Sequence, residues 1–356
     1  MDVIIVGAGL SGLTSAAILY QAGVTVQVIE AANRIGGRIQ AVLDPDTNRP
    51  LADLGPTWVW PKYQPVATQW IERLGVGTFE QFNDGDAVIL GYGPAPHRQP
   101  LPGQDGMVRL VGGPTALIDA LSDQIPDDIV RTSTTVTAIR QEDAGRVAVH
   151  LNDDQVITAD KVIVSVPLRG IAASVQMPWA PASLIAAMQQ TPTWMSTHAK
   201  AVALYERPFW RDAGLSGRIA SRTGPLVEAH DHSAYGGAPG AIFGFVGWPP
   251  ERRRSDPEAL RTAILAQLVE CFGAEAAQPS QLVIEDWALS RHIVTDRDLT
   301  TPPDHPDVGP HILRAPHLDG RVYFSASETS DISPGLIEGA FASGERAAHA
   351  VLGTQR

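Results

Sequence analysis

A glycine-rich turn near the N-terminus restricts the fold of this chain more than any other feature of the sequence. The β-branched apolar run at residues 3–6 is typical of a strand buried on both faces. It leads into a G-x-G-x-x-G pattern at Gly7, Gly9 and Gly12, and then into a stretch with helical spacing. A second strand pattern follows and ends in Glu30. This order of strand, turn, helix and strand predicts a βαβ unit, and hence a doubly wound α/β domain.

The same unit has a specific ligand chemistry. Gly7 permits the tight turn, Gly9 lets the backbone approach a pyrophosphate at the helix N-terminus, and Gly12 lets helix and strand pack closely. Glu30 follows at roughly the 20-residue spacing where a carboxylate accepts ribose hydroxyls, which disfavours NADP and leaves FAD or NAD. The residues predicted to bind the dinucleotide from this unit are Gly7, Gly9, Leu10, Ser11, Gly12 and Glu30.

Composition limits the class of protein and its partners. The chain has 356 residues, which suggests about two domains, and a formal net charge of −12. Such an acidic chain argues against nucleic acid or an anionic membrane as a partner. No apolar run approaches ~18 residues, so no membrane-spanning helix is expected. The single cysteine, Cys271, and the lack of a basic leader lead us to expect a cytoplasmic protein without disulfides.

The segment directly after the second strand separates FAD from NAD. Its sequence, "EAANRIGGR" at residues 30–38, resembles that of the flavin-containing amine oxidase superfamily. The resemblance implies FAD, with Arg38 and the backbone of Gly36 and Gly37 along its diphosphate. Two glycines allow close approach, and an arginine pairs with phosphate through two hydrogen bonds. The FAD contacts implied by this segment are Ala31, Arg34, Gly36, Gly37 and Arg38.

Further stretches resemble the same superfamily, at residues 51–61, 111–121, 132–168 and 321–352. The first, "LADLGPTWVWP", resembles the segment that passes beside the flavin ring. In the last, the resemblance implies that Glu328 lies at the ribityl–phosphate part of FAD. It implies that Leu336 and Ile337 open a helix against the flavin pyrimidine, where the helix N-terminus stabilises negative charge. The FAD contacts implied outside the N-terminal unit are Gly55, Pro56, Thr57, Trp58, Val136, Trp287, Glu328, Leu336 and Ile337.

Lys200 lies in an apolar run, "AKAVALY", that alternates as a strand does. Lys200, Val202 and Leu204 share one face, although a lysine is rarely buried without a partner. One interpretation is an edge strand whose lysine reaches solvent. The other comes from the resemblance, in which Lys200 matches the lysine that holds a water against flavin N5 and is the candidate catalytic residue. The surrounding match favours the second interpretation.

The substrate side departs from the family pattern. Two aromatic rings usually face the flavin as a cage for the amine, one of them from a Gly-x-Tyr element after a tryptophan. Here Trp287 is followed by "ALSRHIVTDRDL" and Leu336 holds the place of the second ring, so neither cage tyrosine is evident. The short segment between Trp58 and Gly112 predicts a smaller lid or a more open pocket. Cys271 lies in a helical pattern outside the tyrosine element that carries covalent flavin in some members, so FAD is expected to be non-covalent.

The candidate metal cluster is weak. His230, Asp231 and His232 fall in "EAHDHS", but a His-x-His pattern in a polar loop without a distant partner is a poor basis for a metal site. We expect a solvated loop there and predict no metal. Asp53, which precedes Gly55 within the segment at 51–61, is expected to be a turn or hydrogen-bonding residue rather than a base.

The sequence therefore predicts a two-domain α/β flavoprotein. A discontinuous, doubly wound FAD-binding domain is expected at residues 1–60, 106–170 and 285–356. A smaller α+β substrate domain with a mainly antiparallel sheet is expected at residues 61–105 and 171–284, and the flavin is expected to lie between the two.

Three functions remain open at this point. The leading hypothesis is oxidation of a C–N bond in an amine or amino-acid-like small molecule, by hydride transfer to flavin N5, with O2 as acceptor and H2O2 as product. The second is an FAD-dependent dehydrogenase, desaturase or tailoring oxidase for a bulkier apolar substrate, since the cage tyrosines are missing. The third is a non-redox flavin isomerase or an FAD-binding protein without turnover. The sequence leaves the substrate, the oligomeric state and the physiological electron acceptor open.

Overall fold

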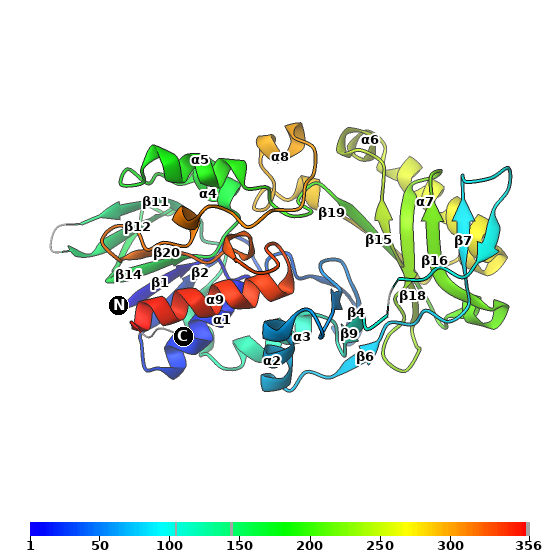
Figure 1. Ribbon diagram of the computed structural model, residues 1–356, viewed down its shortest axis with the longest axis horizontal. Helices are drawn as coiled ribbons and strands as arrows, with labels where there is room; N and C mark the ends of the chain where they lie inside the picture. The colour runs from blue at the N-terminus through cyan, green and yellow to red at the C-terminus, as the bar shows by residue number, and fades with distance from the viewer. Residues whose placement is uncertain (104, 143–144, 354–356) are drawn as a thin grey trace.

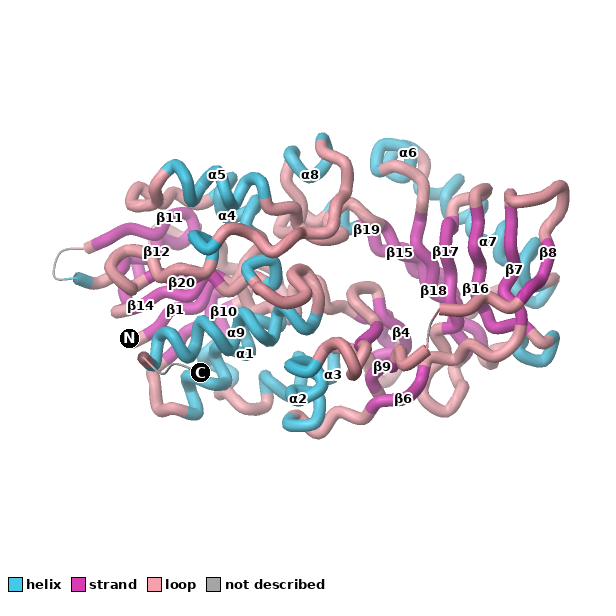
Figure 2. The backbone as a smooth tube through the Cα atoms, viewed as in Figure 1, coloured by secondary structure: helices cyan, strands magenta, loops and turns pink. Residues whose placement is uncertain are grey.

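The computed structural model describes residues 1–103, 105–142 and 145–353, and shows an elongated molecule with a large β-sheet toward each end (Figure 1). One of these sheets has five strands and the other has seven. Helices flank the five-stranded sheet above and below in this view, whereas the seven-stranded sheet presents a row of strands (Figure 2). The fold is mixed α/β, as the sequence predicts.

The strand pairs of the five-stranded sheet are all parallel. Numbered one to five along the chain, its strands lie in the order 3-2-1-4-5, which is the order of dinucleotide-binding sheets. The order of the strands reverses between β1 and β14, and ligands bind at the carboxyl ends beside such a point. The five strands are β1 (Val3–Val6), β2 (Val26–Ile29), β10 (Val130–Arg131), β14 (Lys161–Val164) and β20 (Val322–Phe324).

Helices cover one face of this sheet. The first and last long helices of the chain, α1 and α9, pack side by side (blue and red in Figure 1). They approach closely because Gly344 has no side chain: a Cβ there would lie 2.9 Å from the Cβ of Thr14. The rings of Trp70 and Phe341 stack with their centroids 5.3 Å apart and join a further helix to this core. The helices are α1 (Leu10–Gln21), α2 (Pro65–Arg73), α3 (Thr115–Ser122) and α9 (Ile337–Leu352).

A three-stranded antiparallel meander and two helices cover the opposite face. Their buried apolar side chains form one core with those of β14 and β20. Because the parallel sheet is buried on both faces, its strands are continuous apolar runs instead of alternating ones. These covering elements are β11 (Val136–Gln141), β12 (Val147–Leu151), β13 (Val156–Ala159), α4 (Leu168–Ser174) and α5 (Ala182–Gln190).

The seven-stranded sheet is mainly antiparallel, as predicted; among its described strand pairs only β16 and β7 run parallel. One face packs against α7 (Pro257–Phe272), and the other packs toward β4. In spatial order the strands are β19 (Gln281–Asp286), β15 (Ala199–Tyr205), β18 (Gly240–Val246), β17 (Leu226–Asp231), β16 (Leu215–Ser221), β7 (Asp86–Leu90) and β8 (His97–Gln99).

Short elements join the two large sheets. A three-stranded sheet and a two-stranded ribbon lie between them, and β4 of the ribbon leads into the segment beside Lys200. The ribbon consists of β3 (Ala41–Leu43) and β4 (Pro50–Asp53), and the three-stranded sheet of β5 (Trp58–Val59), β9 (Val108–Leu110) and β6 (Thr78–Glu80). Two further short α-helices are α6 (Pro250–Ser255) and α8 (Asp296–Thr300). Within the described residues, no helix combines the length and the hydropathy needed to cross a membrane.

The position of strand β15 in its sheet shows whether Lys200 lies at an edge or inside the molecule. The strand pairs with β18 on one side and β19 on the other, so the edge-strand interpretation of Lys200 is wrong. Ala201 and Ala203 face the core beneath α7, while Val202 and Leu204 face β4. Lys200 shares the face of Val202 and Leu204 and is 4% exposed, so the lysine lies inside the molecule.

Candidate cofactor and active site

A cavity of about 770 Å³ extends from the carboxyl ends of the parallel strands to β15 and β18. This volume lies in the upper part of the ~300–1,000 Å³ range of small-molecule sites. Most of the predicted site residues line it: Gly7, Gly9, Leu10, Ser11, Glu30, Arg34, Gly36, Gly37, Arg38, Gly55, Pro56, Thr57, Trp58, Lys200, Trp287, Leu336 and Ile337. The predicted residues outside its wall are Gly12, Ala31, Val136 and Glu328.

The turn after β1 leaves room for a ligand and prepares a helix N-terminus for an anion. A Cβ on Gly9 would meet no atom within 4 Å, whereas a Cβ on Gly12 would collide with the carbonyl oxygen of Gly7. Gly7 itself has a φ of +103°, which an L side chain rarely adopts. Among the residues that the structure describes, no side chain caps α1, and its first turn holds no acidic residue. Leu10 and Ser11 of this first turn line the cavity, so the uncapped helix N-terminus suits a dinucleotide diphosphate.

Glu30 is held at the end of β2 by two backbone donors. Its Oε2 accepts the N–H of Ala8 at 2.7 Å, and its Oε1 accepts the N–H of Ala32 at 2.8 Å. The side chain is 8% exposed and lines the cavity. A carboxylate has further lone pairs beyond these two bonds, so Glu30 fits the predicted role of accepting ribose hydroxyls.

An ion pair between Arg38 and the buried carboxylate of Glu328 joins distant segments. Nη1 of Arg38 lies 2.6 Å from Oε1 of Glu328 and donates to the Trp194 carbonyl at 3.1 Å, while Nη2 donates to Ser327 Oγ at 2.9 Å. Burial alone would raise the pKa of the Glu328 carboxyl. The charge and hydrogen bonds of Arg38, with the Ser327 hydroxyl, outweigh burial and hold that pKa below its ordinary value. Arg38 remains 24% exposed, so its guanidinium can also meet a phosphate.

Arg34 orders the loop that carries the paired glycines. Its guanidinium donates to three carbonyls of its own loop at 2.8–3.1 Å and to Gln40 Oε1 at 2.6 Å. Gln40 Nε2 in turn donates to Glu285 Oε2 on β19 at 3.0 Å. Burial raises the pKa of the Glu285 carboxyl, although the charge of Arg34 and the bond from Gln40 act in the opposite direction. The loop is thereby fastened to the seven-stranded sheet.

The Lys200 ammonium group is held at the other end of the cavity. Nζ donates a short hydrogen bond to the carbonyl oxygen of Gly55, and lies 4.9 Å and 5.1 Å from the ring centroids of Phe243 and Phe245. Burial lowers the pKa of Lys200 to about 7, although the negative charge of Asp53 acts in the opposite direction. A lysine with such a pKa can both donate and accept a proton near neutral pH, which suits a chemical role.

Two hydroxyl groups in the cavity wall, Thr57 Oγ1 and Ser165 Oγ, have no hydrogen-bond partner among the described residues. Thr57 is 3% exposed. A buried hydroxyl without a partner costs free energy, and polar atoms of a bound ligand would satisfy it. Both residues therefore fit a polar cofactor. Ser165 was not predicted as a site residue, although it lies within the stretch at 132–168 that resembles the superfamily.

The end of the cavity near Lys200 has aromatic walls. Phe245 lies directly opposite Lys200 in the pairing of β15 with β18, and Glu285 lies opposite it on β19. Sequence patterns alone did not identify Glu285, because only the strand register brings it to the site. Within the described residues no tyrosine lines this cavity; its aromatic residues are Trp58, Trp60, Trp194, Phe245 and Trp287.

The sequence "EAHDHS" is not a solvated loop, and that prediction is wrong. His230 and Asp231 end strand β17, and with His232 they are 1%, 0% and 0% exposed. Asp231 accepts from Trp210 Nε1 at 2.8 Å, and Nε2 of His232 accepts the N–H of Asp53 at 3.0 Å. Burial, with the charge of a neighbouring arginine, lowers the pKa of His232 to about 4, so this ring is neutral. In the part of the chain that the structure describes, no group of three His, Cys, Asp or Glu could hold a metal.

The sequence matches one protein family over nearly its whole length. Residues 10–92 and 95–352 match the family described as flavin containing amine oxidoreductase. A probable flavin-containing monoamine oxidase A from Dictyostelium discoideum is 26% identical over 67% of this chain, and the chain spans about half (52%) of that protein. Putrescine oxidase from Kocuria rosea is 24% identical over 80% of this chain and 83% of its own.

Solved structures agree with this match at the level of the fold. Cyclohexylamine oxidase from Brevibacterium oxydans superposes with a TM-score of 0.82 at 19% identity, over 98% of each chain. At this identity the similarity supports the fold, and the chemistry must be argued from the residues of the cavity.

Proposed function

Because the chain belongs to the family of flavin-containing amine oxidoreductases and is therefore an oxidoreductase, we propose that it binds FAD non-covalently and oxidises the C–N bond of a small amine. When bound, FAD supplies the redox chemistry, by accepting a hydride from the carbon next to nitrogen at N5 and passing the electrons to O2, which leaves as H2O2. The observation that carries the proposal is the position of Lys200, which faces the same cavity as the glycine turn of the parallel sheet.

Residues at the cofactor end of the cavity suit the diphosphate, the ribose and the pyrimidine of FAD. The N-terminus of α1 and the guanidinium of Arg38 would hold the diphosphate, and Glu30 would accept the ribose hydroxyls. The α9 N-terminus, at Leu336 and Ile337, would stabilise negative charge on the pyrimidine. Residues behind the wall would act through the backbone or through packing; these are Gly12, Ala31 and Val136. Cys271 is buried in α7, outside the wall, which supports a non-covalent cofactor.

The residues of the substrate end would orient the amine and exclude water. The Gly55 carbonyl and the faces of Phe243 and Phe245 fix the Lys200 ammonium in one place. From there Lys200 would hold a water or a proton beside the reacting centre. The aromatic faces of Trp58 and Phe245 would attract a cationic amine, and their bulk removes water from around it.

The tryptophan-rich wall also favours a second candidate, a dehydrogenase, desaturase or tailoring oxidase that acts on a bulkier apolar molecule. This candidate keeps the same cofactor site and changes only the substrate. It rests on one observation, that Trp58, Trp60, Trp194 and Trp287 line the cavity while none of its described wall residues is a tyrosine.

We also propose that residues 1–60, 106–170 and 285–356 form the cofactor-binding domain and residues 61–105 and 171–284 the substrate domain. Helices α2 and α5 fall in the second set by sequence, but their apolar side chains pack into the cores on the two faces of the parallel sheet. The single cysteine, free and buried, supports a cytoplasmic location.

A two-step experiment tests the proposed function. The visible spectrum of the purified protein, before and after incubation with FAD, reports flavin binding. A peroxidase-coupled screen of monoamines, diamines and amino acids then reports H2O2. Flavin binding with peroxide from an amine supports the proposal. Flavin binding without peroxide, together with flavin reduction only by non-amine substrates, favours the second candidate. A protein that binds no FAD contradicts both.

A further inference from the structure

A tight turn before β15 presents a methionine at the cavity wall. In this turn Ser196 N–H donates to the Thr193 carbonyl at 3.2 Å, and His198 N–H donates to the Met195 carbonyl at 3.2 Å. Met195 has a φ of +57°, which is uncommon for a residue with a side chain. The turn places Met195 in the wall of the large cavity.

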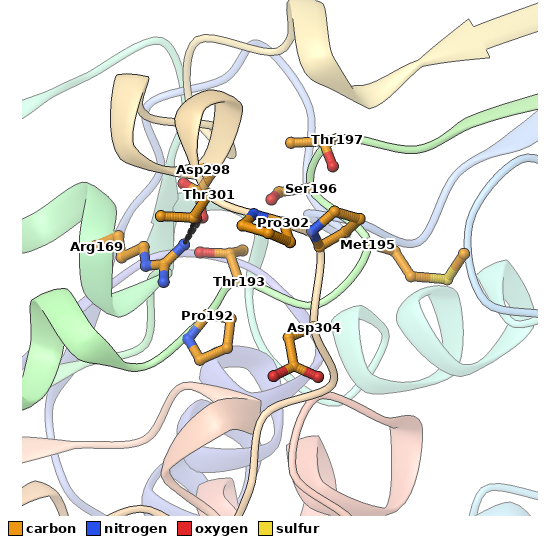
Figure 3. A pocket seen from close by; sticks show the side chains of 11 residues that line it. Arg169, Pro192, Thr193, Met195, Ser196, Thr197, Asp298, Thr301, Pro302 and Asp304 are labelled. Atoms are coloured by element: carbon orange, nitrogen blue, oxygen red, sulfur yellow. Dashed lines mark hydrogen bonds and ion pairs between the residues drawn. The ribbon is translucent and has the colours of Figure 1, made fainter. Parts of the chain in front are cut away.

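Met195 lines the large cavity and also borders a smaller one. This smaller cavity of about 10 Å³ adjoins the turn, which is room for roughly one water. It is bordered by the buried ion pair of Arg169 and Asp298, 2.7 Å apart (Figure 3). In Figure 3 the side chain of Met195 extends away from that ion pair. Met195 is only partly buried and lines the large cavity, so small molecules in the cavity where the substrate is proposed to react can reach this residue.

Met195 differs in this respect from the other methionines of the chain. The chain has five methionines, all described by the structure, and Met195 is the one in the cavity wall. Met107, Met177 and Met188 are buried at 3%, 8% and 0% exposure, and Met1 is 45% exposed at the N-terminus. The chain thus carries buried and surface controls for the chemistry of this one side chain.

We propose that Met195 is a site of oxidative modification, at which hydrogen peroxide formed in the cavity converts the thioether to a sulfoxide. The sulfur lone pair attacks one peroxide oxygen, and the O–O bond breaks. Sulfur loses two electrons and gains that oxygen, while the other oxygen takes up the proton and leaves as water. The proposal rests on the proposed function, which supplies the peroxide.

Oxidation at this position would act on the active site through its neighbours. The Trp194 carbonyl accepts from Arg38 at 3.1 Å, and the Trp194 N–H donates to Glu328 Oε1 at 3.4 Å. A sulfoxide is polar and more rigid than a thioether, so it would disturb an apolar wall next to this ion pair. Turnover would therefore slow as product accumulates, and reduction of the sulfoxide would restore it.

The test compares peroxide made in the cavity with peroxide added from outside. FAD-loaded protein turns over the best amine from the screen, in air, with and without catalase, and a second sample receives H2O2 alone. Peptide mass spectrometry with fragmentation then counts added oxygen at each methionine. Met177, Met188 and Met195 lie within one tryptic peptide, residues 170–200, so the buried controls are measured together with the site.

We expect catalase to protect Met1 and to leave Met195 oxidised, with Met195 at least about tenfold more oxidised than Met188, because susceptibility follows exposure. Met195→Leu, which conserves volume, should resist the slowing of turnover. The proposal would be overturned if the assay produces peroxide and catalase fully protects Met195 from oxidation. If Met195 stays reduced in the sample that receives H2O2 alone, Met195 is not a site of oxidation, whatever reaction the protein catalyses. If the assay shows no peroxide but added H2O2 oxidises Met195, the proposed function fails and the reactive site stands.

Discussion

Burial of Lys200 makes the free energy of unfolding depend on pH in a defined window. Burial lowers the pKa of Lys200 from 10.5 to about 7, against the opposing charge of Asp53. Below about pH 7 this lysine is charged in the folded and unfolded states, and above about pH 10.5 it is neutral in both. Between these values the lysine binds a larger fraction of a proton in the unfolded chain than in the folded protein. The free energy of unfolding therefore rises with pH across this window, and the contribution is lost as pH falls through the folded pKa.

The size of the effect follows from the two pKa values. A shift from 10.5 to about 7 separates the two plateaus by roughly 5 kcal/mol. Relative to the high-pH plateau, the charged lysine lowers the free energy of unfolding by about 4 kcal/mol at pH 7 and by about 2 kcal/mol at pH 9. Lys200 therefore contributes a rise of about 2 kcal/mol in the free energy of unfolding from pH 7 to pH 9. Lys200→Met replaces the titrating group by a flexible apolar side chain and abolishes this contribution.

The assay is urea denaturation of the FAD-loaded wild type and variant at pH 7, 8 and 9, followed by tryptophan fluorescence. The free energy of unfolding of the wild type minus that of Lys200→Met should increase by about 2 kcal/mol from pH 7 to pH 9. Lys62→Met, which removes an exposed lysine, controls for the loss of a positive charge. A difference that stays constant within about 0.5 kcal/mol across this range would refute the reasoning.

Substitutions at four further positions test other parts of the site. Gly12→Ala should destabilise the protein by several kcal/mol or prevent folding, because its Cβ collides with a backbone carbonyl. Gly9→Ala should fold, because its Cβ has room, but should weaken FAD binding. Thermal denaturation measures the first effect, and flavin retention measures the second. Arg38→Met leaves a buried carboxylate without its partner and should cost about 3–5 kcal/mol in urea denaturation, with Arg38→Lys losing less. Asp53→Asn should lower the pKa of Lys200 further, because the charge of Asp53 raises it; NMR of ¹³C-labelled lysine can follow this directly, since the chain has three lysines.

The parts of the fold that depend on local pattern could be predicted from the sequence. The run at 3–6 and the turn at Gly7 and Gly9 predict β1 and the start of α1, because strand burial, turn geometry and helix entry are all properties of neighbouring residues. The alternation around Lys200 likewise gave the two faces of β15.

The environment of buried polar residues could not be predicted in this way. His232 looks like a loop residue because its neighbours in the sequence are polar. In the structure it is buried by residues outside its own segment: the N–H of Asp53, 179 residues away, lies at 3.0 Å, and the ring of Phe243 on the neighbouring strand β18 lies at a centroid distance of 5.2 Å. Burial of a polar side chain is decided by such distant partners, which no local pattern records.

The candidate site shows the same division. Residues that belong to glycine motifs or family stretches were identified, because each motif carries its own geometry. Glu285 was missed, because it reaches Lys200 only through the register of β15 with β19. Met195 was missed because its position depends on a turn with a positive φ that its sequence does not signal.

The central claim is that this cavity brings a flavin and an amine together. The most direct measurement is the visible spectrum of the FAD-loaded protein during anaerobic titration with amines. The account predicts that an amine bleaches the band of oxidised flavin, and that admitting O2 restores the band with release of H2O2. A flavin band that no amine bleaches, while a non-amine substrate does, would contradict the claim, and so would a protein that binds no flavin.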